Sequence, residues 1–132
     1  MRTPAANVTT PDAKMAHLNM AHLPPEALVR VAHRLKAMAD PTRLHILQLL
    51  AAGELCVGDL VARLDCTQAN VSKHLGVLRS AGLVRPRRDG MNVYYAVEEP
   101  AALEVCHLMC GCLEREASRT MADVRQTTAA RT

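Results

Sequence analysis

The apolar residues between positions 41 and 97 change their spacing once, and this change constrains the fold more than any other feature of the chain. From 41 to 80 they recur at every third or fourth position, as on one face of a helix, whereas from 83 to 97 the pattern is that of short strands. Turn residues interrupt the helical stretch near Gly53 and Asp65 and end it at Gly82. The sequence therefore predicts three short helices followed by a β-hairpin.

Capping residues mark where the helices begin and end. We expect a first helix over 24–39, because proline is tolerated in a first turn. Asp40 caps the next helix, which ends near Gly53 and turns inward Leu44, Leu47 and Leu50. A third helix is expected over about 57–64. Thr67 caps a fourth over about 68–80, whose buried side chains we expect to be Val71, Leu75 and Leu78.

The hairpin and a last helix complete a single predicted domain, which is flanked by an arm and a tail. The hairpin joins strands near 83–85 and 93–97, with Asp89-Gly90 at its tip. From 100 to about 125 the pattern is helical again. We expect a flexible arm over 1–23, one domain over 24–126 and a frayed tail over 127–132. A chain of 132 residues has room for one core and none for a two-domain catalytic cleft.

The amino-acid composition and the distribution of charge limit the classes of partner that the chain can bind. The chain has no Phe, no Trp and two Tyr, which excludes an aromatic platform for single-stranded nucleic acid. Between positions 67 and 90, five basic side chains stand against one acidic side chain. This stretch therefore carries +4 of a total net charge of +3, which leaves −1 for the rest of the chain. Such clustering indicates a polyanionic partner, against the alternative of a solvated basic face.

Neither a membrane nor an oxidising compartment is indicated. No stretch approaches the roughly 18 apolar residues of a membrane span, and the first residues lack the apolar stretch of a secretion signal. The number of cysteines, five, is odd, and three of them crowd between positions 106 and 112. A disulfide framework would spread its cysteines along the chain, so we expect free thiols and a cytoplasmic location.

The order of elements is that of a winged helix–turn–helix, which binds double-stranded DNA. The helix over 68–80 suits a major groove about 12 Å wide. Gln68 and Ser72 share one face and can bond base edges, whereas Lys73 and Arg79 suit phosphates. The basic pair of the hairpin can reach a minor groove or its phosphates. We assign DNA binding to Gln68, Ala69, Ser72, Lys73, His74, Arg79, Arg87 and Arg88.

Several motifs, in order along residues 28–113, resemble the ArsR/SmtB repressors. They are DPTRL at 40–44, ELCVGDL at 54–60, QANVSKHL at 68–75, LRSAGLV at 78–84 and the segment 88–95 that ends in two tyrosines. The resemblance implies a homodimeric α+β fold, mainly α, with about five helices and a two-stranded wing. Its first and last helices would form the dimer contact. It also implies a repressor, not an enzyme, that leaves its operator DNA when an inducer binds.

The position of the inducer site departs from the patterns that the resemblance implies. Arsenic and cadmium sensors carry two cysteines at the start of the third helix, where this chain has Cys56 and then Gly58. Zinc and nickel sensors use Asp, His and Glu on the last helix. Here that helix offers softer ligands, Cys106, His107, Cys110 and Cys112.

The thiols of the last helix are the strongest chemical signal. Cys106 and Cys110 are four residues apart, about 40° around a helix, so both can chelate one ion. Cys112 lies about 120° from Cys106. A third ligand then requires distortion at Gly111, Cys112 of the partner subunit, or Cys56. The alternative is that these cysteines are small buried apolar residues of a dimer-forming helix.

Thiolate ligands select soft ions. We predict that Cys106, Cys110 and Cys112 bind As(III) or Sb(III), which take three sulfurs in a pyramid, with Cd, Pb or Hg as competitors. Zinc prefers four ligands, and His107 does not share the face of Cys106. A second hypothesis keeps the repressor but lets the same cysteines sense oxidants or persulfides by forming a disulfide or polysulfide.

Overall fold

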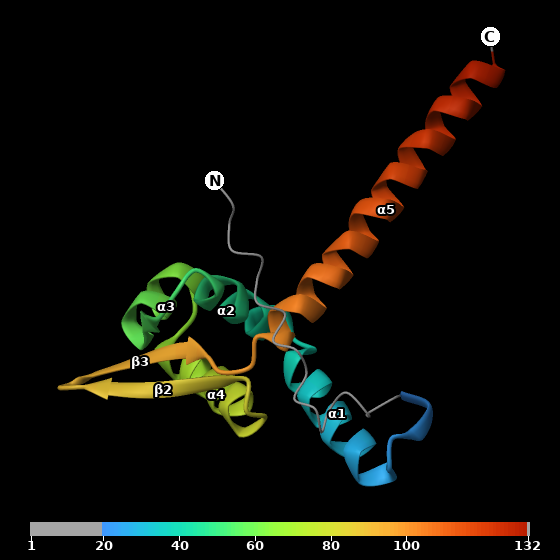
Figure 1. Cartoon of the computed structure of the whole chain (residues 1–132). Helices are drawn as coiled ribbons and strands as arrows, with labels where there is room; N and C mark the ends of the chain where they lie inside the picture. Colours follow the sequence, from blue (N-terminus) through green and yellow to red (C-terminus); the bar gives the residue numbers. More distant parts are fainter. Residues whose placement is uncertain (1–19, 132) are drawn as a thin grey trace, which may run out of the picture. The chain divides into compact units, whose positions relative to one another are not determined.

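The computed structural model describes residues 20–131. Its elements are the 3₁₀ turn η1 and the helices and strands of Figure 1, in the order η1 (Met20–His22), α1 (Pro25–Met38), α2 (Pro41–Ala51), β1 (Leu55–Cys56), α3 (Val57–Leu64), α4 (Gln68–Ser80), β2 (Val84–Asp89), β3 (Asn92–Val97) and α5 (Ala101–Ala130). The prediction of five helices with a wing after the fourth is confirmed. Helices α3 and α4 with their turn, followed by the hairpin, form a winged helix–turn–helix.

The chain divides into two compact units, Met1–His33 and Arg34–Thr132. The first holds η1 and most of α1, in which Leu28 and Val31 are exposed. Of the flexible arm expected over 1–23, all but 20–23 lies outside the described residues. The second unit holds the end of α1 and every later element.

The core of the second unit joins α2, α3, α4 and the sheet. Its largest fully buried side chains are Ile46, Leu47, Leu60, Val71, Leu75, Leu78 and Leu83. The expected inward face of α4 is therefore confirmed. On α2, Leu44 was expected to face inward but is 39% exposed, and Ile46 is buried instead. The sequence of α2 is apolar on several faces, so its spacing alone did not decide which face packs.

The predicted caps are present. The Asp40 carboxylate accepts a hydrogen bond from the Arg43 amide at 3.0 Å, and the Thr67 hydroxyl accepts one from the Asn70 amide at 3.2 Å. These bonds satisfy amides that the first turns of α2 and α4 leave without helical partners. Asp65 ends α3 in the left-handed conformation, with φ of 51°. The caps thus set the turn between the two helices of the motif.

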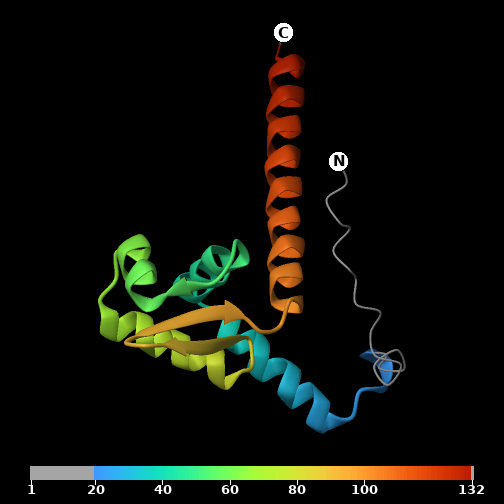
Figure 2. The ribbon, with the colours of Figure 1, turned by 60° about the vertical axis from the view of Figure 1, so that its left-hand side comes forward.

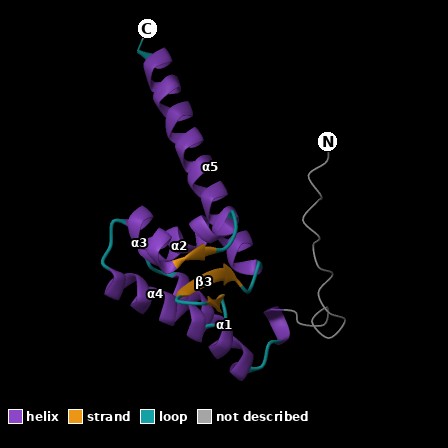
Figure 3. Ribbon diagram, turned by 90° about the vertical axis from the view of Figure 1, so that its left-hand side faces the viewer, coloured by secondary structure: helices purple, strands orange, loops and turns teal. Residues whose placement is uncertain are grey.

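The sheet has three antiparallel strands in the order β1-β3-β2 and packs against α2 and α4 (Figure 3). Strand β1, which the sequence analysis did not predict, pairs Leu55 with Tyr95, and two residues are too few to show alternation. In the hairpin Asp89 pairs with Asn92, so the tip is Gly90-Met91 and not Asp89-Gly90 as expected. Glycine at the first loop position supplies the positive φ, 60°, that this tight turn needs.

Helix α5 packs against α2 through its first turns only, where Ala102 is buried. Beyond them it extends past the other elements of the second unit (Figure 2), and Leu108, Leu113 and Val124 are exposed. Helix α5 continues to Ala130, past the end near residue 125 that the sequence pattern indicates. Neither glycine nor proline interrupts the sequence after Gly111, which lets the helix continue. Within residues 20–131 no helix is long and apolar enough to cross a bilayer.

Candidate DNA-binding and thiol sites

Helix α4 presents a polar face to solvent. While Val71, Leu75 and Leu78 are buried beneath it, the exposed residues include five of those assigned to DNA, namely Gln68, Ala69, Ser72, Lys73 and Arg79. The same helix therefore has an apolar side in the core and a side of hydrogen-bonding and cationic groups that is accessible to a ligand. A DNA groove requires such a face.

His74 lies elsewhere on α4. It is half-buried, and its Nδ1 lies 3.3 Å from Nη1 of Arg43 and 3.9 Å from Oδ1 of Asp40. The ring thus faces the first turn of α2 and is held away from the exposed face of α4. Although we assigned His74 to DNA contact, its contacts with Arg43 and Asp40 indicate that it holds α4 in place against α2.

Arg43 is a structural residue that the sequence analysis missed. Its Nε donates to the carbonyl oxygen of Ala37, and its Nη2 donates to that of Lys36 at 3.4 Å. Those carbonyls belong to the last turn of α1, where helical donors run out, and the Lys36 oxygen also accepts from the Ala39 amide at 3.2 Å. Arg43 thus connects the end of α1, the start of α2 and, through His74, the middle of α4. An arginine in a first turn carries no local signal of this role.

The two wing arginines assigned to DNA differ in their surroundings. Arg87 places its Nε 3.1 Å from both carboxylate oxygens of Glu54, and its guanidinium lies 4.8 Å from the centre of the Tyr94 ring. Hydrogen bonding to Arg87 holds the pKa of Glu54 below its ordinary value. Adjacent strand residues point to opposite faces, and exposed Arg88 has no ion pair among residues 20–131. Arg88 is thus the more available cation.

Cys106 and Cys110 line one groove, as their spacing predicts. The groove has a volume of about 750 Å³, and its walls come from the end of α1, from α2 and from α5. Burial, followed by the neighbouring Cys110, raises the pKa of the Cys106 thiol. Apart from the thiols and a few polar side chains, the lining is apolar and includes Leu35, Met38, Leu44, Leu103, Met109 and Leu113.

The other cysteines lie apart from this pair. Cys112 is outside the groove, and its sulfur accepts a hydrogen bond from Arg115 Nη2 at 3.2 Å. The Cys56 thiol lies 3.1 Å from Oδ2 of Asp59, and a Cβ added at Gly58 would lie 3.9 Å from the Cys56 sulfur. Cys66 donates to a backbone carbonyl, and all five cysteines are free. The part of the chain that the structure describes contains no cluster of three or more potential metal ligands.

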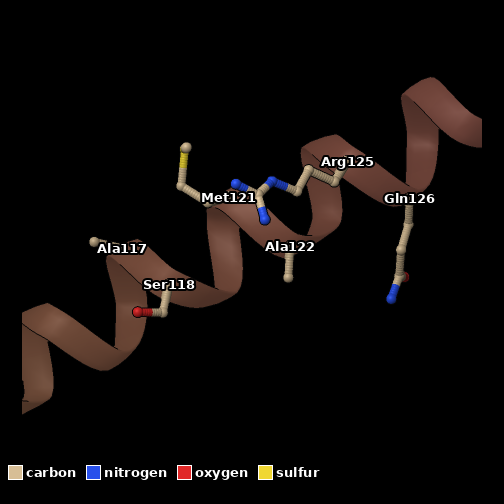
Figure 4. A pocket seen from close by; sticks show the side chains of 6 residues that line it. All are labelled: Ala117, Ser118, Met121, Ala122, Arg125 and Gln126. Atoms are coloured by element: carbon tan, nitrogen blue, oxygen red, sulfur yellow. The ribbon is translucent and has the colours of Figure 1, made fainter.

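A shallow hollow lies farther along α5. It is lined by Ala117, Ser118, Met121, Ala122, Arg125 and Gln126, and Figure 4 shows all six side chains on this one helix. Within residues 20–131 every residue that lines the hollow belongs to α5, so the hollow is an open stretch of helix surface.

Comparison with known proteins identifies the family. The profile described as "Bacterial regulatory protein, arsR family" matches residues 40–85. The solution structure of the homodimeric winged helix–turn–helix domain Mb0332 of Mycobacterium bovis, described as a possible ArsR-family regulator, is 31% identical, with a TM-score of 0.65. The match covers 71% of this chain and 87% of that one. The chain belongs to the arsR family. This membership confirms the family that the sequence motifs indicated.

Two curated relatives of this arsR-family chain are named repressors. The biofilm growth-associated repressor of Agrobacterium fabrum is 46% identical over 72 residues, which are 54% of this chain and 62% of the relative. The arsenical resistance operon repressor of Escherichia coli is 49% identical over 61 residues, 46% of this chain and 52% of the relative. The match thus spans between half and two thirds of each relative.

Proposed function

We propose that this protein is a transcriptional repressor that binds operator DNA as a homodimer and is released when a thiophilic ion binds thiols on α5. One observation carries the proposal. Helix α4 exposes Gln68, Ser72 and Lys73 on one side while its other side is fixed in the core. A recognition helix must combine these two properties, because its polar groups contact base edges only if the helix itself is held rigidly.

The cations around α4 support the DNA contact. Lys73 and Arg79 are exposed on α4, and Arg88 is exposed on the wing. Contacts of such residues with phosphates fix the register of a protein on the duplex without reading sequence. Specific contacts are then the task of Gln68 and Ser72. We propose these roles for the residues that the structure leaves accessible.

Exposed apolar side chains support a homodimer. Leu28 and Val31 on α1, and Met121 and Val124 on α5, are exposed in the single chain. Met121 and Val124 are three residues apart and share one face of α5, and we infer that this face contacts the partner subunit. A twofold dimer would present two α4 helices to successive major grooves, so the operator would contain inverted half-sites.

The groove thiols support the inducer site. Cys106 and Cys110 can share one soft ion, and we propose As(III) or Sb(III), with Cd, Pb or Hg as alternatives. The groove is lined by α2 as well as α5, and the start of α2 contacts α4 through Arg43 and His74. An ion that shifts α5 against α2 therefore has a contiguous route to the recognition helix. Allosteric coupling of this kind is usually worth about 1–3 kcal/mol.

Serine substitutions test the proposal. Cys106→Ser and Cys110→Ser should bind DNA from upstream of the protein's own gene as tightly as the native chain but should no longer be released by arsenite. Cys66→Ser, which changes a thiol bonded only to a nearby carbonyl, is the control and should respond normally. Fluorescence anisotropy of a labelled duplex measures both properties. Normal release of the two groove variants, or activation of a reporter by the apo protein, would contradict the proposal.

The redox alternative uses the same pair of thiols. Cys106 and Cys110 both line the groove, so an oxidant would join these two sulfurs in a disulfide or polysulfide. Release by a thiophilic ion under strict reduction distinguishes the mechanisms. Release by an oxidant alone would favour redox sensing.

A further inference from the structure

The groove is lined by two cysteine thiols, one fewer than the three that inorganic arsenite takes. Cys106 and Cys110 line it, whereas Cys112 lies outside it beside Arg115. His45 also lines the groove, yet residues 20–131 contain no cluster of three or more potential metal ligands. Arsenic(III) without an organic group completes a pyramid with three sulfurs. Arsenic(III) that already carries one carbon completes the same pyramid with two.

We infer that the groove binds monosubstituted organic arsenicals, R–As(III), in preference to inorganic arsenite. This inference rests on the proposed function, since it specifies the inducer of the same site. Two sulfurs from Cys106 and Cys110 hold the arsenic atom, and the organic substituent occupies the apolar groove beside them.

The spacing of the thiols suits one arsenic atom. Residues four apart on a helix have Cβ atoms about 5–6 Å apart, and rotation about the Cα–Cβ bonds brings their sulfurs closer. Cys110 is near enough to Cys106 to contribute to the raised pKa of its thiol. Cys112 lies on another side of α5, so it cannot join the pair while the helix stays regular.

The walls of the groove suit a carbon substituent. The end of α1 contributes Leu35 and Met38, α2 contributes Leu44, and α5 contributes Met109 and Leu113. A volume of about 750 Å³ exceeds what a methyl or phenyl group needs. Apolar surface removed from water stabilises the complex, and inorganic arsenite has no such surface to bury.

The binding step is balanced without an oxidant. A hydrated arsenical R–As(OH)₂ reacts with two thiols to form R–As(S–Cys)₂ and two molecules of water. Two As–O bonds break and two As–S bonds form, while each thiol proton leaves with a hydroxide as water. Arsenic stays trivalent and each sulfur keeps its oxidation state.

The experiment uses the reduced full chain on its operator duplex, titrated with phenylarsine oxide or with sodium arsenite. We expect half-release at a concentration of phenylarsine oxide about tenfold lower than that of arsenite, because the phenyl group is buried. Intact-mass spectrometry should show one phenylarsenic group per chain. Cys106→Ser and Cys110→Ser should abolish both signals, and Cys112→Ser should leave both unchanged.

A matched pair of variants tests the apolar wall. Met109 lines the groove and Leu108, its neighbour on α5, does not. Met109→Ser should raise the half-release concentration of phenylarsine oxide several-fold and change that of arsenite little. Leu108→Ser should leave the half-release concentrations of both compounds unchanged. Equal or better release by arsenite, lost in Cys112→Ser, would overturn the inference and leave the proposed function in place. Release by neither compound, and by none of Sb(III), Cd, Pb or Hg, would overturn both.

Discussion

Arg43 Nη1 lies 3.3 Å from Nδ1 of His74 and thereby joins the first turn of α2 to the middle of the recognition helix α4. The same guanidinium donates to the carbonyl oxygen of Ala37 at the end of α1. Three helices therefore meet at one side chain. Since a guanidinium can only donate, a hydrogen bond between the two side chains makes Nδ1 the acceptor.

Removing the imidazole should loosen α4. His74→Ala deletes the acceptor and should lower the free energy of unfolding by about 1 kcal/mol. It should also weaken operator binding, because a less firmly held helix makes its base contacts less often. His74→Asn keeps an acceptor near the position of Nδ1 and should restore most of both losses. Urea unfolding and duplex anisotropy measure the two effects, and an alanine variant with native DNA affinity would contradict the positioning role.

Neutralising Glu54 should make Arg87 available to DNA. Glu54→Gln keeps the shape of the side chain but removes the charge that pairs with Arg87. We expect tighter binding to any duplex and a plot of log Kd against log salt that is steeper by about 0.9, the value of one additional phosphate contact. Glu98→Gln, which frees Arg85 instead, is the comparison. An unchanged salt slope in Glu54→Gln would show that Arg87 does not reach phosphate.

Acid should weaken the start of α2. The Arg43 amide donates to the Asp40 carboxylate and holds the pKa of that carboxyl below its ordinary value of 3.8. A lowered pKa means that the stabilisation is complete above about pH 4 and is lost as the pH falls through the folded-state pKa. Asp40→Ala should therefore cost about 1 kcal/mol at pH 7 and much less near pH 2. Urea unfolding at both pH values tests this, and an equal cost at the two would contradict it.

Two glycines should respond in opposite directions to alanine. Gly90 at the hairpin tip has φ of 60°, so Gly90→Ala is strained and should destabilise the protein by about 1 kcal/mol. Gly76 lies within α4 with open space around it, so Gly76→Ala should stabilise by about 0.5–1 kcal/mol. Thermal unfolding of both variants provides the comparison. Stabilisation by Gly90→Ala would mean that the tip does not need its positive φ.

Features encoded by neighbouring residues were predictable, and features that depend on distant contacts were not. The bounds of α3 and α4 match because Thr67 and Gly82 act on the turns beside them. The separation of Cys112 from the other two thiols follows from helical geometry alone. By contrast, the Arg87 and Glu54 pair joins residues 33 positions apart, and no local pattern indicates it.

The space beside Cys56 would allow a second thiol at the start of α3. A Cβ at Gly58 would lie in ordinary contact with the Cys56 sulfur, and Gly58 does not need a positive φ. One substitution, Gly58→Cys, would thus install a second thiol there without rebuilding the backbone. A chain with thiols at the start of α3 as well as on α5 would hold two separate sites for soft ions, while the exposed face of α4 stayed unchanged.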